Sequence, residues 1–299
     1  MYKLYEKYMY KLIAIDLDGT LLNSYGVISE IDKEAIKKAI KKGVKVILTS
    51  GRGTMSVKNF ANELEIDGDI ICGNGAIIYN LQEDRIIYNQ YIDKKKVLQI
   101  IKICEENSIY YNVFTEDTIL TSSLAYNVLF YNQENIKKPD SKKTNINIIP
   151  NIYKYVEERE KEDYLKICIC DKNDIIFGGI MKKLKEVKNV NVMEVAHMAR
   201  KLIANGTDYV PVEYYITEIM NQDADKWNAV KFLADKYKIK TDEVITIGDN
   251  VNDEQMLKNA GIGVAMGNSA PYIKEMAKEV TLDNNSGGVA NVIEKHILK

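Results

Sequence analysis

The chain has 299 residues, of which 46% are hydrophobic and 28% are charged. This composition is typical of a soluble globular protein, and the length suggests about two domains. No apolar run approaches the ~18 residues that a membrane-spanning helix needs. The 41 basic and 43 acidic residues leave a net charge of −2, which gives no electrostatic basis for binding a polyanion. We therefore exclude a membrane-spanning protein and expect no nucleic-acid partner.

The first ten residues, MYKLYEKYMY, combine charges with tyrosines and lack the apolar segment of a secretory signal. This pattern predicts a cytoplasmic protein. The string MYKL occurs at Met1 and again at Met9, which leaves two expectations open. Either Met9 is the natural start, or residues 1–8 form a frayed tail without function.

The cysteines and histidines show no spacing that is typical of a metal site. No CxxC pair occurs, and His197 and His296 are far apart in the sequence. We expect buried, reduced thiols rather than disulfides or metal ligands. The cysteines are Cys72, Cys104, Cys168 and Cys170.

Strands and helices alternate in the structure that we predict for residues 11–75. Ser29 is the expected N-cap of the first helix, whose apolar positions recur on one face until Gly43 ends it. A second helix is expected near residues 54–64. The predicted strands are KLIAID (residues 11–16), VKVILTS (44–50) and DIICGNG (69–75). This βαβαβ order predicts a parallel sheet with right-handed crossovers.

The segment of residues 84–213 is rich in Lys, Asn, Tyr and Ile and has helices and strands of its own. It follows a predicted β-hairpin that turns at residues 82–84, and its polar stretch at residues 132–147 is expected to be a surface loop. The expected helices are residues 94–107 and 174–188, and the expected strands are residues 110–114, 165–170 and 190–195. We interpret the segment as an inserted α+β domain of roughly 130 residues, an ordinary domain size.

The alternation of strands and helices returns in residues 214–299. The expected strands are residues 214–219, 243–249 and 261–266, and the expected helices are residues 225–238 and a segment that follows Asn250. We therefore expect residues 1–83 and 214–299 to form one α/β core with a parallel sheet, which the insertion interrupts.

Two aspartates, Asp16 and Asp18, stand where the first predicted strand ends. Residues two apart in an extended chain face the same side, so we expect both carboxylates to point into one small volume. Like charges this close resist joint ionisation, so either one carboxyl keeps its proton or a cation binds the pair. The alternative is structural: Asp18-Gly19 is a turn, and Asp16 caps a turn or helix.

Polar residues also follow the other predicted parallel strands, and ligands of open parallel sheets bind at that edge. They are Ser50, Gly51 and Arg52 after the second strand, Asn74 after the third, Asp249 after a later strand, and Lys226, Asn252 and Asp253 at the starts of helices. Carboxylates suit Mg²⁺, which keeps several waters and takes a substrate phosphate. Hydroxyl groups, a lysine and helix N-termini suit the phosphate itself.

Each of these residues also has an ordinary structural explanation. Ser50 could cap the following helix, and Lys226 could be a solvated surface lysine. Asp249 and Asp253 could be first-turn acids that the helix dipole favours. The string GIGVAMG lacks the spacing of a dinucleotide fingerprint, so we discount it. Because all of the structural explanations would have to hold at once, at strand ends in order, we favour one shared site.

The motifs DLDGTLL, TSGR and GDNVND, together with Lys226, resemble the four ordered motifs of the haloacid dehalogenase superfamily. The strings CGNGA, AGIGVAMGN and NNSGGVANVIEKHI resemble its Cof-type sugar-phosphatase branch. The resemblance covers most of residues 11–83 and 214–299. It implies a Rossmann-like parallel-sheet core with an inserted α+β cap domain of the C2 type, and a Mg²⁺-dependent phosphohydrolase.

The resemblance also implies roles for the site residues. Asp16 is the nucleophile that forms an aspartyl-phosphate, and Asp18 is the general acid and then the base. The implied phosphate-binding residues are Ser50, Gly51, Arg52, Asn74, Lys226 and Asn252. The implied metal site comprises Asp16, Asp18 (through its backbone carbonyl), Asp249 and Asp253. A carboxylate nucleophile splits hydrolysis into two displacements, while Mg²⁺ and Lys226 offset charge on the phosphoryl group.

We expect a phosphatase that acts on a small phosphorylated metabolite, such as a sugar phosphate, with Mg²⁺ as its cofactor. It is expected to be a monomer or a weak homo-oligomer, with neither a nucleic-acid nor a membrane partner. Two alternatives remain: a phosphomutase of the same superfamily, and a phospho-accepting, receiver-like signalling protein. The chain length and the insertion disfavour the receiver. Trp227 departs from the family pattern, since relatives usually carry a small residue after the lysine, which puts the packing around Lys226 in question.

Overall fold

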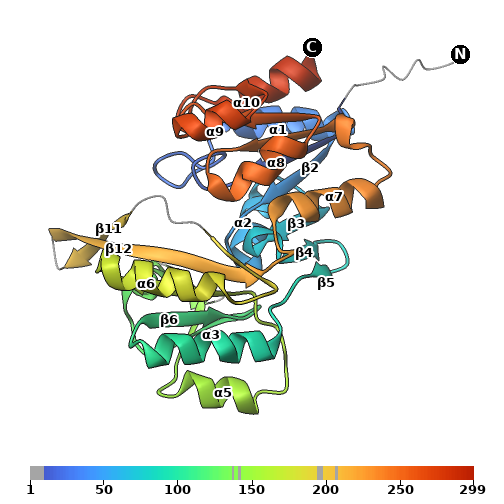
Figure 1. Cartoon of the computed structure of the whole chain (residues 1–299). Helices are drawn as coiled ribbons and strands as arrows, with labels where there is room; N and C mark the ends of the chain where they lie inside the picture. The colour runs from blue at the N-terminus through green and yellow to red at the C-terminus, as the bar shows by residue number, and fades with distance from the viewer. Residues whose placement is uncertain (1–9, 137, 141–142, 194–197, 206–207) are drawn as a thin grey trace, which may run out of the picture. The chain divides into compact units, whose positions relative to one another are not determined.

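The computed structural model describes residues 10–136, 138–140, 143–193, 198–205 and 208–299 (Figure 1). The expectations about Met9, about residues 1–8 and about the end of a strand at residues 194–195 lie outside this described part. The chain divides into two compact units, of which the first comprises Met1–Asn89 and Asp225–Lys299 and the second comprises Gln90–Ala224. Within the described residues, every helix is too short or too polar to span a membrane.

The first unit contains an eight-stranded sheet with β1 among its central strands. In order across the sheet, the strands are β15 (Glu279–Val280), β14 (Ile262–Ala265), β13 (Val244–Gly248), β1 (Leu12–Asp16), β2 (Lys45–Thr49), β3 (Asp69–Cys72), β4 (Ile77–Asn80) and β5 (Arg85–Asn89). Neighbours from β15 to β3 are parallel, whereas β4 and β5 form an antiparallel hairpin at the edge. The expected α/β core with a parallel sheet is confirmed.

Helices connect these strands, and the first of them begins and ends where its residues predict. Ser29 caps α1 by accepting a hydrogen bond from Asp32 N at 3.2 Å, and Gly43 follows the helix with a φ of 84°. The helices of this unit are α1 (Glu30–Lys41), α2 (Thr54–Glu63), α7 (Lys226–Lys236), α8 (Glu254–Asn259), α9 (Pro271–Met276) and α10 (Gly288–Ile293), with 3₁₀ turns η1 (Gly73–Gly75), η3 (Thr241–Glu243) and η4 (Val251–Asp253) and the π-helical end η5 (Glu294–Leu298).

The second unit has its own sheet and its own apolar core. Its strands run in the order β10 (Val190–Val192), β12 (Asp208–Asn221), β9 (Lys166–Asp171), β6 (Tyr110–Phe114), β7 (Thr118–Thr121) and β8 (Asn145–Ile148), and β11 (Ala199–Asn205) pairs with β12. Its helices are α3 (Lys94–Glu106), α4 (Tyr126–Ile136), α5 (Ile152–Glu158) and α6 (Asp174–Lys185). Apolar residues of α3, α5 and α6 pack with those of β6, β9 and β12, so this insertion is an α+β domain, as expected.

The strand expected at residues 214–219 exists, but it belongs to the second unit rather than to the core. It is part of the long strand β12, which pairs with β9 from Tyr215↔Asp171 to Ile219↔Ile167. The chain therefore returns to the first unit at Asp225 rather than at residue 214. An alternating apolar pattern identifies a strand, but the partner strand decides to which sheet it belongs.

Two further expectations are corrected near the insertion. Strand β5 pairs with β4, so the first unit extends to Asn89 rather than to residue 83. Residues 132–147 are not one loop, because α4 continues to Ile136 and β8 begins at Asn145. Between residues 132 and 147, the polar side chains of α4 and β8 are partly or fully exposed, and at such positions polar composition does not distinguish a helix or an edge strand from a loop.

Candidate active site at the carboxyl ends of the parallel strands

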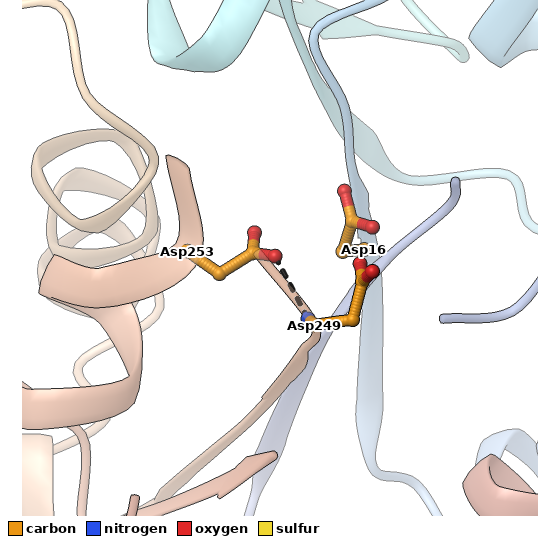
Figure 2. Close-up of side chains that lie close together, drawn as sticks. All are labelled: Asp16, Asp249 and Asp253. Atoms are coloured by element: carbon orange, nitrogen blue, oxygen red, sulfur yellow. Dashed lines mark hydrogen bonds between the residues drawn. The ribbon is translucent and has the colours of Figure 1, made fainter. Parts of the chain in front are cut away.

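Three carboxylates gather where β1 and β13 end. Asp16 is the last residue of β1, Asp249 follows β13, and Asp253 ends the 3₁₀ turn η4. Because β1 and β13 are adjacent and parallel, with Ile15 opposite Ile247, their carboxyl ends meet at one edge. Figure 2 shows the three side chains close together, and one oxygen of each lies within 4.8 Å of the others.

Lys226 is buried among these carboxylates. Its Nζ lies 2.5 Å from Asp16 Oδ1 and 2.6 Å from Asp253 Oδ1, and the residue is 1% exposed. Burial alone would lower the pKa of Lys226, but the two carboxylates raise it above its ordinary value. The alternative of a solvated surface lysine is therefore wrong.

The start of α7 holds Lys226 in this position. Asp225 is the N-cap of the helix, and its side chain accepts a hydrogen bond from Asn228 N at 2.8 Å. Gly75, with a φ of 94°, lies against this helix start: a Cβ at Gly75 would be 2.1 Å from Asp225 O. Trp227 packs against the apolar cluster that includes Leu12 and Leu233, so its bulk does not displace Lys226 from the site.

The Asp253 carboxylate accepts three hydrogen bonds. Its Oδ2 accepts from the backbone N–H groups of Asp249 at 2.9 Å and Asn250 at 3.1 Å, and Lys226 binds Oδ1. Figure 2 draws the bond from Asp249 as a dashed line. A Cβ at Gly248 would lie 2.5 Å from Asp253 Cβ, so a glycine is needed there. Asp253 thus holds the backbone that carries Asp249.

Thr20 and Gly19 complete the surroundings of Asp249, and neither of them is among the site residues expected from the sequence. Thr20 is 1% exposed, and its Oγ1 donates to Asp249 Oδ1 at 3.2 Å. Gly19 has a φ of 82°, and a Cβ there would lie 2.3 Å from Asp249 Oδ2. The turn signal Gly19-Thr20 was visible in the sequence, but the contact of this turn with Asp249 was not.

The acidic group carries more negative charge than Lys226 can neutralise. Burial and the nearby Asp253 carboxylate raise the pKa of Asp249 to about 7. Burial and Asp253 also raise the pKa of Asp16 well above its ordinary value, although Lys226 opposes this shift. Buried oxygen donors that repel one another are suited to a hard divalent cation, which would relieve the repulsion. These residues could therefore hold a metal ion.

The side chain of Asp18 lies outside this acidic group and is bound by Arg52. Nε of Arg52 lies 2.8 Å from Asp18 Oδ2, and Nη2 lies 2.5 Å from Oδ1. β1 ends at Asp16 and the chain turns at Leu17, and the expectation that the Asp16 and Asp18 carboxylates point into one small volume stays a prediction. The alternation of an extended strand therefore stops before Asp18, and its carboxylate does not belong to the acidic group that could hold a metal ion.

Four of the expected phosphate-binding residues lie together beside the end of β2: Ser50, Gly51, Asn74 and Asn252. Ser50 Oγ accepts a hydrogen bond from Arg52 N at 3.1 Å, and Asn74 N donates to Ser50 O at 2.9 Å. A Cβ at Gly51 would be 2.8 Å from Asn74 Oδ1, which itself accepts from Asn252 Nδ2 at 3.0 Å. The N-cap of α2 is Gly53. Ser50 therefore does not have the capping role that we considered as an alternative.

Comparisons with known proteins identify the family of the chain. The profile of the haloacid dehalogenase-like hydrolases matches residues 13–293. Phosphatase YwpJ of Bacillus subtilis is 30% identical over 96% of this chain and 100% of that protein. The 5-amino-6-(5-phospho-D-ribitylamino)uracil phosphatase YwtE of the same organism is 32% identical over 95% of this chain and 97% of its own length.

A solved structure supports the same assignment. The structure of a haloacid dehalogenase-like hydrolase from B. subtilis superposes with a TM-score of 0.77 at 29% identity, and the match covers 96% of this chain and 99% of the other. The match spans both units, so it includes the inserted domain as well as the parallel sheet. The chain belongs to the haloacid dehalogenase-like hydrolases and, within them, to the Cof-type phosphatases.

Proposed function

We propose that the protein is a Mg²⁺-dependent phosphatase that hydrolyses phosphate monoesters of small metabolites through an aspartyl-phosphate on Asp16. The observation that carries the proposal is the buried Asp16 carboxylate, held by Lys226 beside Asp249. Lys226 orients the carboxylate and supplies a fixed positive charge. A carboxylate that is desolvated and oriented in this way is suited to attack phosphorus.

The acidic group fits Mg²⁺ by the chemistry of its donors. Asp16 and Asp249 would hold the ion, together with the Asp18 backbone carbonyl, and Asp253 would act through its hydrogen bonds to the Asp249 backbone. When bound, the ion would offset negative charge on the transferring phosphoryl group. Its binding would also remove the repulsion that raises the pKa of Asp249.

In the first step, an Asp16 oxygen forms a bond to phosphorus while the bond between phosphorus and the leaving oxygen breaks. Asp18 gives a proton to that leaving oxygen. In the second step, Asp18 takes a proton from water, the water oxygen bonds to phosphorus, and the Asp16–phosphorus bond breaks. Inorganic phosphate leaves, and both carboxyl groups return to their starting states. Lys226 offsets charge on the phosphoryl oxygens in both steps.

The ion pair between Asp18 and Arg52 adds a step to this mechanism. A carboxylate held by both Nε and Nη2 of a guanidinium cannot carry the proton that an acid must donate. We propose that the phosphate of the incoming substrate attracts Arg52 and releases Asp18, which then takes up a proton from water before the first step. Ser50, Gly51, Asn74 and Asn252, which lie together beside Arg52, would bind the remaining phosphate oxygens.

A relative and the inserted unit support a proposal for the substrate class. The name of YwtE describes a phosphate ester of a ribityl chain, which is sugar-like. We propose a phosphorylated sugar or polyol as the substrate, with the unit Gln90–Ala224 as the cap that sets specificity. We propose no nucleic-acid or membrane partner, and a monomer or weak homo-oligomer.

The test is a panel of phosphate monoesters, containing sugar phosphates and p-nitrophenyl phosphate, assayed for released phosphate with Mg²⁺ and with excess chelator. We expect release that needs Mg²⁺ and that Asp16→Asn abolishes. Full turnover in chelator would contradict the requirement for a metal ion, and turnover by Asp16→Asn would contradict the role of Asp16 as the nucleophile. An isomerised sugar phosphate without free phosphate would indicate a phosphomutase, and a long-lived phosphoenzyme would indicate a receiver-like protein.

A further inference from the structure

Two asparagines from the C-terminal part of the chain bind the loop that follows β1. Asn268 lies just after β14, and its Nδ2 donates to Gly19 O at 2.8 Å. Asn284 lies between β15 and α10, and its Nδ2 donates to Leu22 O at 2.8 Å. The bonded residues are 249 and 262 positions apart in the sequence, respectively. This loop is the one that carries Asp18 and Thr20.

The two asparagines are also connected to each other. Asn268 Oδ1 accepts a hydrogen bond from Asn284 N at 3.1 Å, so the Asn268 side chain bridges Gly19 and Asn284. Asn284 is 8% exposed, and a buried amide of this kind is stable only while its polar atoms are paired. An asparagine amide suits the position because it donates and accepts from one planar group.

The loop also forms backbone hydrogen bonds within itself, and these involve atoms other than the carbonyls of Gly19 and Leu22. Leu21 N donates to Asp16 O at 3.2 Å, and Leu22 N donates to Leu17 O at 2.8 Å. These bonds close the turn at its base, whereas the Asn268 and Asn284 amides bind the carbonyls of Gly19 and Leu22, which lie on either side of Thr20. The two asparagines therefore bind the part of the turn that bears Thr20 and that follows Asp18 directly.

The Gly19 peptide has little freedom to adopt another orientation and still serve the site. Asp18 precedes Gly19 and Thr20 follows it, and Thr20 donates to Asp249 Oδ1. A rotation of the Gly19 carbonyl would therefore move both the backbone of Asp18 and the hydroxyl that binds Asp249. We infer that Asn268 and Asn284 are positioning residues, which hold Asp18 and Thr20 in the geometry that the reaction needs.

This inference rests on the proposed role of Asp18 as the general acid. A misplaced acid should matter most for a poor leaving group, because an aryl oxygen leaves without a proton. Misplacement by about 1 Å can cost ~10²-fold in rate. For Asn268→Ala and Asn284→Asp, we expect the rate of the first turnover on a sugar phosphate to fall about 10- to 100-fold, and the burst rate on p-nitrophenyl phosphate to fall far less.

Asn285 provides the matched control. It is exposed and binds farther along the same loop: Ser24 N donates to its Oδ1 at 3.1 Å, and its Nδ2 lies 3.0 Å from Ser24 Oγ. Asn285→Ala removes these two hydrogen bonds and a longer one from Nδ2 to Asn284 Oδ1 at 3.5 Å, but it leaves the bonds to Gly19 and Leu22 in place. We expect this variant to retain kcat on both substrates within about twofold.

The experiment measures the rate of the first turnover by rapid quench, together with kcat and KM, for the full-length chain with Mg²⁺, on p-nitrophenyl phosphate and on the sugar phosphate of the panel with the highest kcat/KM. The first-turnover rate reports the step in which the leaving group departs. The variants are Asn268→Ala, Asn284→Asp, Asn285→Ala and, as a reference, Asp18→Asn, and the Tm of each is recorded. Asn268 is exposed, so its variant tests the inference even if Asn284→Asp fails to fold. A loss on the sugar phosphate alone, with no such loss in Asn285→Ala, supports the inference.

Equal losses on both substrates, or no loss, in a folded Asn268→Ala overturn the positioning role. The Asp18→Asn reference separates this result from a failure of the proposed function. If Asp18→Asn selectively loses the sugar phosphate and the asparagine variants do not, the inference alone is wrong. If Asp18→Asn shows no dependence on the leaving group, the proposed role of Asp18 is wrong, and the inference falls with it.

Discussion

Each unit of the molecule has a buried lysine that binds carboxylate side chains. The two lysines differ in how much negative charge surrounds them. In the second unit, Lys166 Nζ lies 2.5 Å from Glu218 Oε1 and 4.9 Å from the centre of the Phe114 ring. Burial would lower the pKa of Lys166, but Glu218 raises it. In the first unit, Lys226 binds Asp16 and Asp253, with Asp249 close by.

The charges of Lys166 and Glu218 offset each other, and we call these two residues the balanced pair. In the other group, the carboxylates outnumber Lys226. Lys166 and Glu218 form an ion pair of the kind that a stable fold can bury. The group around Lys226 has surplus carboxylates, and burial together with the Asp253 carboxylate raises the pKa of Asp249 to about 7. Among the described residues, this is the one group of acidic side chains close enough together to hold a metal ion. Surplus buried charge of this kind indicates a site that binds a ligand rather than one that only stabilises the fold.

The largest expected effect comes from removing the attacking group of the unbalanced site. Asp16→Asn should abolish turnover on every substrate, because an amide at this position cannot form the aspartyl-phosphate. The measurement is phosphate release together with acid-quench detection of a covalent phosphoenzyme. The partner experiment is Glu218→Gln in the balanced pair, which should keep measurable turnover on p-nitrophenyl phosphate. Turnover by Asp16→Asn that depends on Mg²⁺ would remove the functional distinction between the two lysine sites.

Asp18→Asn should have the next largest effect, and it should be selective. We expect sugar phosphates to lose ~10²–10⁴-fold in kcat, since their leaving oxygen needs a proton. An aryl phosphate should still transfer its phosphoryl group to Asp16 and then stop, because no base activates the water. Rapid-quench kinetics should therefore show a burst of aryl alcohol near one equivalent, with acyl phosphate trapped on the protein. Wild-type rates on sugar phosphates would refute this division of roles.

Substitutions in the balanced pair should lower the free energy of unfolding rather than alter catalysis. Glu218→Gln leaves the Lys166 charge buried without its carboxylate, which typically costs about 3–5 kcal/mol of unfolding free energy. The double variant Lys166→Met with Glu218→Leu removes both charges and should recover most of this loss. Denaturant unfolding of the three proteins measures it. A double variant as unstable as the single one would mean that the pair contributes more than charge balance.

The smallest expected effect is a pH dependence of the metal-free protein. The folded pKa of Asp249 is about 7, above that of the unfolded carboxyl at about 3.9, so the folded state keeps a proton that the unfolded chain has lost. Stability therefore falls as the pH rises from about 4 to 7. Asp249→Asn should reduce this decline, to which the raised pKa of Asp16 also contributes, and should stabilise the metal-free protein at pH 8 by about 1–2 kcal/mol, after allowance for solvent screening.

Thermal unfolding in chelator, across pH 4–8, measures this effect, with Asn285→Ala as the control that keeps the decline. Addition of Mg²⁺ should restore stability to the parent protein at pH 8 and much less to Asp249→Asn, since ligand binding stabilises the folded state. A parent protein whose metal-free stability rises steadily from pH 4 to 8 would contradict the surplus charge at this site.

Much of the core and of the site could be predicted because it depends on local patterns. Ser29 and Gly43 mark the ends of α1, and apolar runs mark β1, β2 and β13. Once those strands are parallel, their carboxyl ends must share an edge, which brings Asp16 and Asp249 together. The clustering of the acidic residues with Lys226 thus follows from the order of elements along the chain.

Contacts between distant segments could be decided only by the tertiary structure. Residues 214–219 alternate as a strand does, but pairing with β9 decides that they belong to the second unit. Asp18 turns to Arg52, Thr20 binds Asp249 and Asn284 holds Leu22, across 34, 229 and 262 residues of sequence. Periodicity and capping act over a few residues, whereas these side chains choose partners only after the sheet has brought its loops together.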